Sequence, residues 1–198
     1  MKAIFAWQHV IAFFIFWAIV LSAIWLFGCK SSPPGGNSIP NFFVVSQTNR
    51  IYRGAEPTLV GWQELRDLGV TNVVKLDTDA ESTDSNALIM GMVVRRFPIT
   101  TEQQLLGPLT KGLVEKAVNA ITPGTYVHCG SDSRSNPNSL AARFGTQGGQ
   151  DRTGLIIACY RVDVQGWPKD DARAEMLKLG FHPILHGLNE YWENFTPH

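Results

Sequence analysis

Short strand-like runs alternate with runs of helical periodicity over residues 42–160. β-Branched and aromatic residues favour short strands at 42–45, 51–52, 73–76, 92–97 and 125–128. Helices are expected between them, at 58–68, where Thr58 caps the start and Gly69 closes the end, and at 109–121. Strands separated by helices need crossover connections. The sequence therefore predicts an α/β fold with a largely parallel central sheet flanked by helices on both faces.

The N-terminal segment has a different character from the rest of the chain. Residues 10–28 form nineteen positions without a charge, long enough to cross a bilayer as a helix. Leu26-Phe27-Gly28-Cys29 resembles a bacterial lipoprotein signal, which implies lipidation of Cys29; an uncleaved membrane helix is the alternative. We expect a signal or anchor at 1–29, a flexible Ser/Pro/Gly tether at 30–40 and a folded domain at 41–198 in the periplasm of a bacterial cell envelope.

Charge and cysteine content exclude several classes of protein. The chain has 17 basic and 17 acidic residues and no net charge, so no nucleic-acid partner is expected. Three cysteines provide no disulfide framework, and Cys159 falls in an apolar stretch that predicts a buried thiol. His182, His186 and His198 have no partner at metal-ligand spacing, so we expect no metal and no other cofactor.

Reactive side chains are expected where a strand ends and a helix begins. Cys129 follows the strand at 125–128, at the edge of a parallel sheet where ligands bind. Gly149-Gln150-Asp151-Arg152-Thr153-Gly154 opens an apolar helix. Glycine-rich backbone at a helix N-terminus cradles an anion, and an arginine adds a planar fork that matches phosphate oxygens. The same field favours the thiolate form of a cysteine, which is a nucleophile.

These residues resemble the cysteine-based tyrosine and dual-specificity phosphatases, whose signature is H-C-x5-R-[ST]. The likeness extends over most of residues 45–195, including 49–57, 68–76 and Trp167 with Ala172, Glu175 and Met176. The resemblance implies that Cys129 attacks phosphorus, Arg152 holds the equatorial oxygens, Thr153 assists departure of the thiolate and His128 orients the nucleophile. It also implies a phosphate-binding loop made of Gly148, Gly149, Gln150, Asp151 and Arg152.

The spacing departs from that signature. Twenty-two residues separate Cys129 from Arg152, so residues 130–146 form a seventeen-residue insertion directly after the expected nucleophile. Lengthening a loop from five to 22 residues costs only about 1.3 kcal/mol. The geometry is satisfied if the insertion is an Ω-like excursion whose ends lie close together.

A second arrangement uses the same cysteine. Residues 129–135 read C-x4-R-S, which is similar to the active loop of rhodanese-type sulfurtransferases and would make Arg134 the partner of Cys129. Asp132 replaces a glycine usual in that loop, and a carboxylate near the sulfur opposes a persulfide anion.

Phosphatases of this kind also need a carboxylic acid to protonate the leaving oxygen. Glu102 lies 27 positions before Cys129, just after a predicted strand, and is our first candidate. Asp77, Asp79 and Glu81 follow another strand end and are the alternatives. Arg53 is expected to anchor a turn or an ion pair rather than to touch substrate.

The sequence thus predicts a membrane-tethered phosphomonoester hydrolase that works through a phosphocysteine intermediate. Its partners would be the membrane and a phosphorylated protein or a small phosphomonoester. Phosphotyrosine, phosphoserine or phosphothreonine, inositol phosphates and phosphoinositides all remain open as substrates. The alternatives are an inactive phosphatase-like binding module of the envelope and a rhodanese-like sulfurtransferase.

Overall fold

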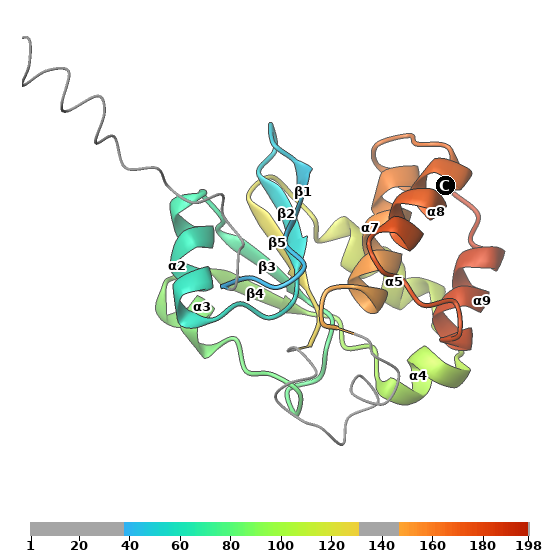
Figure 1. Ribbon diagram of the computed structural model, residues 1–198, viewed down its shortest axis with the longest axis horizontal. Coiled ribbons are helices and arrows are strands. Elements are labelled where there is room, and N and C mark those ends of the chain that lie inside the picture. The colour runs from blue at the N-terminus through green and yellow to red at the C-terminus, as the bar shows by residue number, and fades with distance from the viewer. Residues whose placement is uncertain (1–37, 131–146, 198) are drawn as a thin grey trace, which may run out of the picture. The chain divides into compact units, whose positions relative to one another are not determined.

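The computed structural model describes residues 38–130 and 147–197 (Figure 1). The expected anchor at 1–29 with Cys29, most of the expected tether and, of the insertion at 130–146, residues 131–146 with Arg134 lie outside these residues. Among the described residues, no helix is both long enough and apolar enough to span a membrane.

Five short strands form one sheet in the order β1-β2-β5-β3-β4. The strands are β1 (Phe43–Ser46), β2 (Ile51–Gly54), β3 (Asn72–Lys75), β4 (Val93–Arg96) and β5 (Thr125–His128). β1 is antiparallel to β2, and the other neighbouring strands are parallel. The expected α/β architecture with a largely parallel sheet is therefore confirmed.

Seven helices are described around the sheet. They are α2 (Leu59–Asp67), α3 (Ser85–Ile89), α4 (Thr101–Leu106), α5 (Lys111–Asn119), α7 (Asp151–Asp163), α8 (Lys169–Lys178) and α9 (His186–Asn194). The start of α2 is capped as expected, since the Thr58 hydroxyl accepts a hydrogen bond from the Gly61 amide. No local pattern in the sequence predicted α3, α4, α8 or α9.

The two faces of the sheet bury two separate hydrophobic clusters, because successive side chains of a strand point to opposite faces. Tyr52, Val73 and Tyr126 pack with Trp62 and Leu65 of α2. Their chain neighbours, Ile51, Val74 and Val127, pack on the other face with residues of α5, α7, α8 and α9. Figure 1 shows α2 and α3 on one side of the sheet and the larger helical group on the other.

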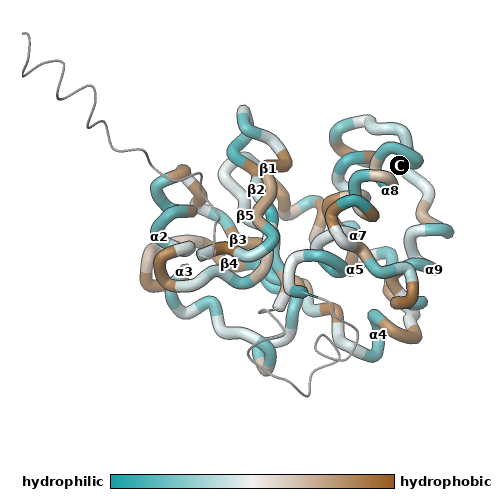
Figure 2. Tube along the Cα trace, viewed as in Figure 1, coloured by the Kyte–Doolittle hydropathy of each residue, from teal (hydrophilic) through white to brown (hydrophobic). Residues whose placement is uncertain are grey.

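Helix α7 is the centre of the larger cluster. Its first twelve residues are buried, including Cys159, as expected for an apolar helix enclosed on all sides. Figure 2 shows hydrophobic residues along α7, whereas most residues of α8 are hydrophilic. Arg161 joins the two helices through a two-point ion pair with Glu175, at 2.9 and 2.8 Å, and lies 4.2 Å above the ring centre of Trp167. α7 is therefore held rigidly, with its N-terminus at the sheet edge.

The packed domain begins earlier than the expected boundary at residue 41. Ile39 is buried against α2, and the Pro40 carbonyl accepts a hydrogen bond from the Ala55 amide at 2.8 Å. Ser38 donates to Glu64 at 2.7 Å. Residues 38–40 therefore belong to the folded domain and not to the tether, because the Ser/Pro/Gly composition that suggested a tether ends before Ile39.

Candidate active site

The carboxyl ends of three parallel strands place Cys129 at one edge of the sheet. His128, the last residue of β5, is paired with Gly54 of β2 and Lys75 of β3. The Leu76 amide donates to the His128 carbonyl at 3.0 Å, and the Glu56 amide donates to the Gly130 carbonyl at 3.1 Å. Cys129 is thus fixed between two strand ends and is 3% exposed.

The chain that precedes α7 returns to the same place. A β-carbon at Gly148 would lie 2.1 Å from the Gly130 carbonyl oxygen, so the two ends of the long excursion are in contact. Gly149 has a φ of +82°, and a β-carbon there would lie 2.2 Å from the backbone of Gly54. Only glycine fits this close approach. The loop therefore lies directly against the end of β2, despite the insertion.

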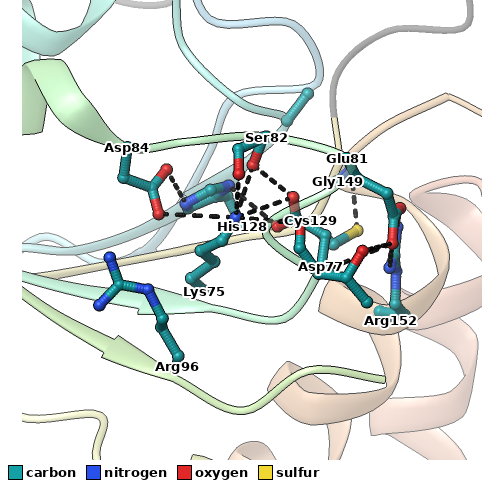
Figure 3. A network of polar contacts seen from close by, with 12 residues as sticks. Lys75, Asp77, Glu81, Ser82, Asp84, Arg96, His128, Cys129, Gly149 and Arg152 are labelled. Atoms are coloured by element: carbon teal, nitrogen blue, oxygen red, sulfur yellow. Dashed lines mark hydrogen bonds and ion pairs between the residues drawn. The ribbon is translucent and has the colours of Figure 1, made fainter. Parts of the chain in front are cut away.

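One amide of this loop faces the sulfur. The Gly149 N–H donates a hydrogen bond to Sγ of Cys129 at 3.3 Å (Figure 3). A backbone donor aimed at sulfur stabilises negative charge there, as does the N-terminal end of α7. The two segments that the sequence places 20 residues apart thus meet at the thiol.

Arg152, in the first turn of α7, is held by a carboxylate from another loop. Its Nη1 and Nη2 donate to the two oxygens of Glu81 at 3.0 and 2.7 Å, and Nη1 also donates to the Ile99 carbonyl at 3.0 Å. The built β-carbon position at Gly130 lies 3.0 Å from Nη2 of Arg152, which places the guanidinium beside the residue after Cys129.

The electrostatics agree with this geometry. Burial opposes the charge of Arg152, but the neighbouring Cys129 and Glu81 outweigh it and raise the pKa of the guanidinium. Burial would raise the pKa of Glu81, but the hydrogen bond and charge of Arg152 hold that pKa below its ordinary value. Both partners are therefore charged at neutral pH, and the sulfur and the guanidinium lie within electrostatic reach of each other.

Two side chains brace the outer side of the loop. Arg53, from β2, donates through Nη2 to the Gly149 carbonyl at 2.6 Å and to the Gln150 carbonyl at 3.4 Å. Asn41 donates to the Gly148 carbonyl at 2.8 Å. Arg53 therefore anchors a turn, as the sequence suggested, and the turn belongs to the candidate phosphate-binding loop.

A buried polar network lies behind Cys129 (Figure 3). Nζ of Lys75 contacts Asp77 at 3.2 Å, Asp84 at 3.9 Å, and the carbonyl and hydroxyl of Ser82 at 2.7 and 2.8 Å. Ser82 also donates to Asp77. The network ties together the two ends of residues 76–84, the loop that carries Glu81.

His128 joins this network from β5. Its Nε2 lies 3.2 Å from a carboxylate oxygen of Asp84 and its Nδ1 lies 3.9 Å from Asp77. The ring stacks on Tyr126 at 5.7 Å between centres and meets Trp62 edge to face at the same distance. Burial raises the pKa of Asp84, but the contact with His128 and its charge lower it more. His128 thus fixes the strand end from which Cys129 emerges.

The neighbours of Arg152 on α7 are also buried. Asp151 accepts from the backbone amide of His182 at 2.8 Å and contacts its Nδ1 at 3.0 Å, which ties the loop to the segment after α8. The hydroxyl of Thr153 is buried and has no hydrogen-bond partner in the described part of the chain.

The candidate proton donors are placed differently from one another. Glu102 is exposed in the first turn of α4, three residues beyond Ile99, whose carbonyl holds Arg152. Asp77 is bonded to Lys75 and Ser82, and the exposed Asp79 pairs with Arg96 at 3.4 Å. Glu81 is engaged by Arg152 and its lowered pKa makes it a poor acid. Glu102 remains the first candidate, because it is the one carboxylate of these four without a hydrogen bond or ion pair among the described residues.

Three contributions to the site were not predicted from the sequence: the ion pair of Glu81 with Arg152, the identity of the turn that Arg53 anchors, and the network around Lys75. One signal was available. Lys75 interrupts an otherwise apolar strand and is followed by Asp77, Asp79 and Asp84, and a lysine in a buried strand requires partners of opposite charge. The other two contacts join positions 71 and 96 residues apart and leave no local pattern.

Known structures share this arrangement of elements. P. aeruginosa TpbA is 23% identical over 84% of this chain and 94% of its own, with a TM-score of 0.58. The core catalytic domain of the PP-IP phosphatase SIW14 from S. cerevisiae is 20% identical over 81% of this chain and 89% of its own, with a TM-score of 0.58. PTPMT1, solved in complex with PI(5)P, is 18% identical over 77% of this chain and 94% of its own, with a TM-score of 0.54.

Comparison by sequence finds no match. No protein-family model matches the chain, and no curated protein matches it either. The likeness therefore lies in the arrangement of strands and helices: this chain has the fold of the cysteine-based tyrosine and dual-specificity phosphatases.

Proposed function

We propose that the chain is a phosphomonoester hydrolase in which Cys129 is the nucleophile and Arg152 binds the phosphate. The observation that carries this proposal is the meeting of Sγ of Cys129 with the Gly149 amide at 3.3 Å, beside the guanidinium of Arg152. A nucleophile and an anion-binding fork at one point are the minimum requirement for phosphoryl transfer through a covalent intermediate.

Arg152 has donors left for a substrate. Of its five N–H groups, two bind Glu81 and one binds Ile99. The remaining two, on Nε and on the outer side of Nη2, point from one edge of the guanidinium, and no described residue accepts from them. That edge matches two oxygens of a phosphate. Glu81 therefore orients Arg152 and leaves its phosphate-binding edge open.

The reaction takes place in two steps. The Cys129 thiolate attacks phosphorus as the bond to the ester oxygen breaks, and the leaving oxygen takes a proton from an acid, for which we propose Glu102. Water, which returns a proton to that carboxylate, then attacks the phosphocysteine, the S–P bond breaks and inorganic phosphate leaves. The unpartnered Thr153 hydroxyl donates to the sulfur as it departs, and Arg152 with the loop amides stabilises the equatorial oxygens.

The substrate is a phosphomonoester whose class the site leaves open. TpbA has been solved with phosphotyrosine, SIW14 is described as a PP-IP phosphatase, and PTPMT1 has been solved with PI(5)P. The absence of net charge on this chain favours substrates with few phosphates.

Hydrolysis of p-nitrophenyl phosphate tests the proposal. We expect Cys129→Ser to abolish turnover and Arg152→Ala to reduce it by about 10²–10³-fold. Cys159→Ala is the matched control, because that thiol is buried within α7 away from the loop, and it should retain activity. A pre-steady-state burst of p-nitrophenolate equal to the enzyme concentration would identify the covalent step. Full activity in Cys129→Ser would exclude the proposed nucleophile.

The alternatives give different results in the same assays. A binding module that has lost catalysis, suggested by the insertion beside the thiol, would show no turnover but would retain a phosphate analogue. A sulfurtransferase would form thiocyanate from cyanide and thiosulfate in a reaction that needs Arg134 and not Arg152.

We also propose that residues 1–29 hold the domain at a bacterial membrane, in the periplasm. The support is the uncharged run at 10–28 followed by Cys29. Palmitate labelling that is lost in Cys29→Ser would indicate a lipoprotein, whereas membrane association without label would indicate an uncleaved helix. Recovery of the unlabelled full chain in the soluble fraction would contradict both.

A further inference from the structure

A second pocket lies on the outer side of the loop that carries Gly149. It has a volume of about 280 Å³, and its wall includes Asn41, Phe43, Arg53, Gln150, Lys178 and Gly180. Gly149 separates it from the thiol: the N–H of this residue binds Sγ of Cys129, and its carbonyl binds Arg53. The pocket is therefore distinct from the candidate active site but is built on the same loop.

Arg53 supplies a buried cation to this wall. Its side chain is 1% exposed, and Nη1 has no hydrogen-bond partner in the described part of the chain. The charge of Glu175 acts on Arg53, but the two carboxylate oxygens of Glu175 accept hydrogen bonds from Nε and Nη2 of Arg161. Burial lowers the pKa of Arg53 to about 10, so the guanidinium keeps its charge at neutral pH. A buried charged donor without an acceptor is costly, and an anion would satisfy it.

Lys178 and Gln150 add donors from the other two sides. Lys178 is exposed in the last turn of α8, and no ion pair or hydrogen bond to its ammonium is found among residues 38–130 and 147–197. Gln150 uses its side-chain oxygen to accept from the Gln147 amide at 2.9 Å, which leaves its NH₂ group as a donor. That nitrogen lies 2.5 Å from the position of a β-carbon at Gly180, so it faces this wall of the pocket.

The lining as a whole has two cations and no acidic side chain. We propose that this pocket binds a small tetrahedral oxyanion, phosphate or sulfate, at a site separate from that of Cys129. Arg53 and Gln150 belong both to the pocket and to the support of the loop. A bound oxyanion would therefore hold the loop from the side on which the Gly149 carbonyl binds Arg53. A substrate would occupy the opposite side, where the Gly149 amide faces Cys129.

The test is a titration of inorganic phosphate into the ¹⁵N-labelled full chain in detergent, carrying Arg152→Ala to remove binding at the first site. We expect saturable shifts of the Phe43 and Gly180 amides. In Lys178→Ala, the dissociation constant should rise by at least about fivefold. Lys116→Ala is the matched control, since this exposed lysine lies on α5, away from the pocket, and it should bind as the parent does.

The proposal would be overturned by the absence of shifts at Phe43 and Gly180 up to millimolar phosphate, or by an unchanged dissociation constant in the Lys178→Ala chain. A titration with sodium chloride at matched ionic strength identifies shifts that salt alone causes, and equal shifts there would also count against a specific site. The readout does not depend on turnover, so a failure here is separable from a failure of the proposed hydrolase activity.

Discussion

Glu81 determines which N–H groups of Arg152 remain free. An end-on carboxylate uses the inner N–H groups of Nη1 and Nη2 and leaves the edge formed by Nε and Nη2 free. The Ile99 carbonyl fixes the remaining outer N–H of Nη1. The guanidinium is thus held on two sides before any ligand arrives, which lowers the entropy lost when phosphate binds. In the proposed hydrolase, Glu81 is a positioning residue that acts through Arg152.

Replacing Glu81 should therefore affect catalysis more than folding. We expect Glu81→Ala to lower kcat/KM for p-nitrophenyl phosphate by roughly tenfold to hundredfold, because Arg152 loses its orientation. Glu81→Gln, which keeps one acceptor, should recover part of the loss. Glu193→Ala removes an exposed partner of Arg173 on α9 and should stay within about twofold of the parent, as expected for a surface ion pair. Equal kinetics in Glu81→Ala and the parent would show that the ion pair has no part in the site.

The same ion pair makes a pH-dependent contribution to stability. The pKa of Glu81 is lower in the folded chain than its ordinary value of 4.5, so the folded state binds its proton less readily than the unfolded state. The stabilisation is complete above pH 4.5 and is lost as the pH falls through the lowered pKa. Urea unfolding at a series of pH values should show a smaller decrease below pH 4.5 in Glu81→Gln than in the parent. The same decrease in both would contradict this assignment.

At the scale of elements, the loop between β5 and α7 depends on glycine at one position. Gly149 combines a left-handed backbone with an approach of 2.2 Å between a built β-carbon and the backbone of Gly54. Gly91 has nearly the same φ, +81°, but no atom within 4 Å of its built β-carbon. A substitution at Gly91 therefore tests the left-handed conformation alone, whereas one at Gly149 tests that conformation together with a steric clash.

We expect Gly91→Ala to cost about 1–2 kcal/mol of stability, from the left-handed conformation alone, and to leave turnover unchanged. Gly149→Ala should cost more and should also reduce turnover, because the loop must move away from β2 and its amide must move away from Sγ of Cys129. Urea unfolding and p-nitrophenyl phosphate hydrolysis on both variants provide the comparison. Similar losses of stability and full activity in both would show that the close approach is not required.

The elements also show what local sequence patterns can predict. β5 and the capped α2 were predicted because alternation, the Thr58 cap and the glycine that follows are local signals. α8 was missed because its only buried residues are Ala172 and Met176, which leave almost no amphipathic pattern. α3 and α4 are shorter than the window over which helical periodicity can be recognised.

Local patterns likewise predict some residues of the candidate site and not others. The positions of Cys129 and Arg152 at a strand end and a helix start followed from strand and helix patterns. The partners that hold Arg152 and the loop, Glu81 and Arg53, come from strands and loops distant in sequence. Such pairings depend on the strand order of the sheet, which no local pattern specifies.

The whole fold accommodates the seventeen-residue insertion at 130–146, although it lies directly after Cys129 in the candidate active site. Gly130 and Gly148 are in contact, so the chain leaves and re-enters the described domain at one place, which is what the expected Ω-like excursion requires. Lengthening a closed loop costs little entropy. The sheet, α7 and the network behind Cys129 hold the two halves of the loop independently of what joins them.

Deleting residues 130–146 restores five residues between Cys129 and Arg152. We expect the shortened chain to fold and to keep or increase p-nitrophenyl phosphate hydrolysis, because Gly54 and Arg53 hold the returning loop. Of the deleted residues, Gly130 accepts a hydrogen bond from the Glu56 amide, and the Gln147 carbonyl takes its place after Cys129. Circular dichroism confirms folding before activity is compared. A folded, inactive deletion of an active parent would show that the excursion is itself part of the site.

A crystal structure of the full chain with tungstate or vanadate tests the proposed site most directly. Tungstate resembles phosphate, and vanadate resembles the transition state of phosphoryl transfer. We predict one oxyanion whose central atom lies about 3–3.5 Å from Sγ of Cys129. Nε and Nη2 of Arg152 bind it, and Glu81 stays on the other edge of the guanidinium. An oxyanion that contacts the guanidinium while the sulfur faces a different cavity would contradict the account.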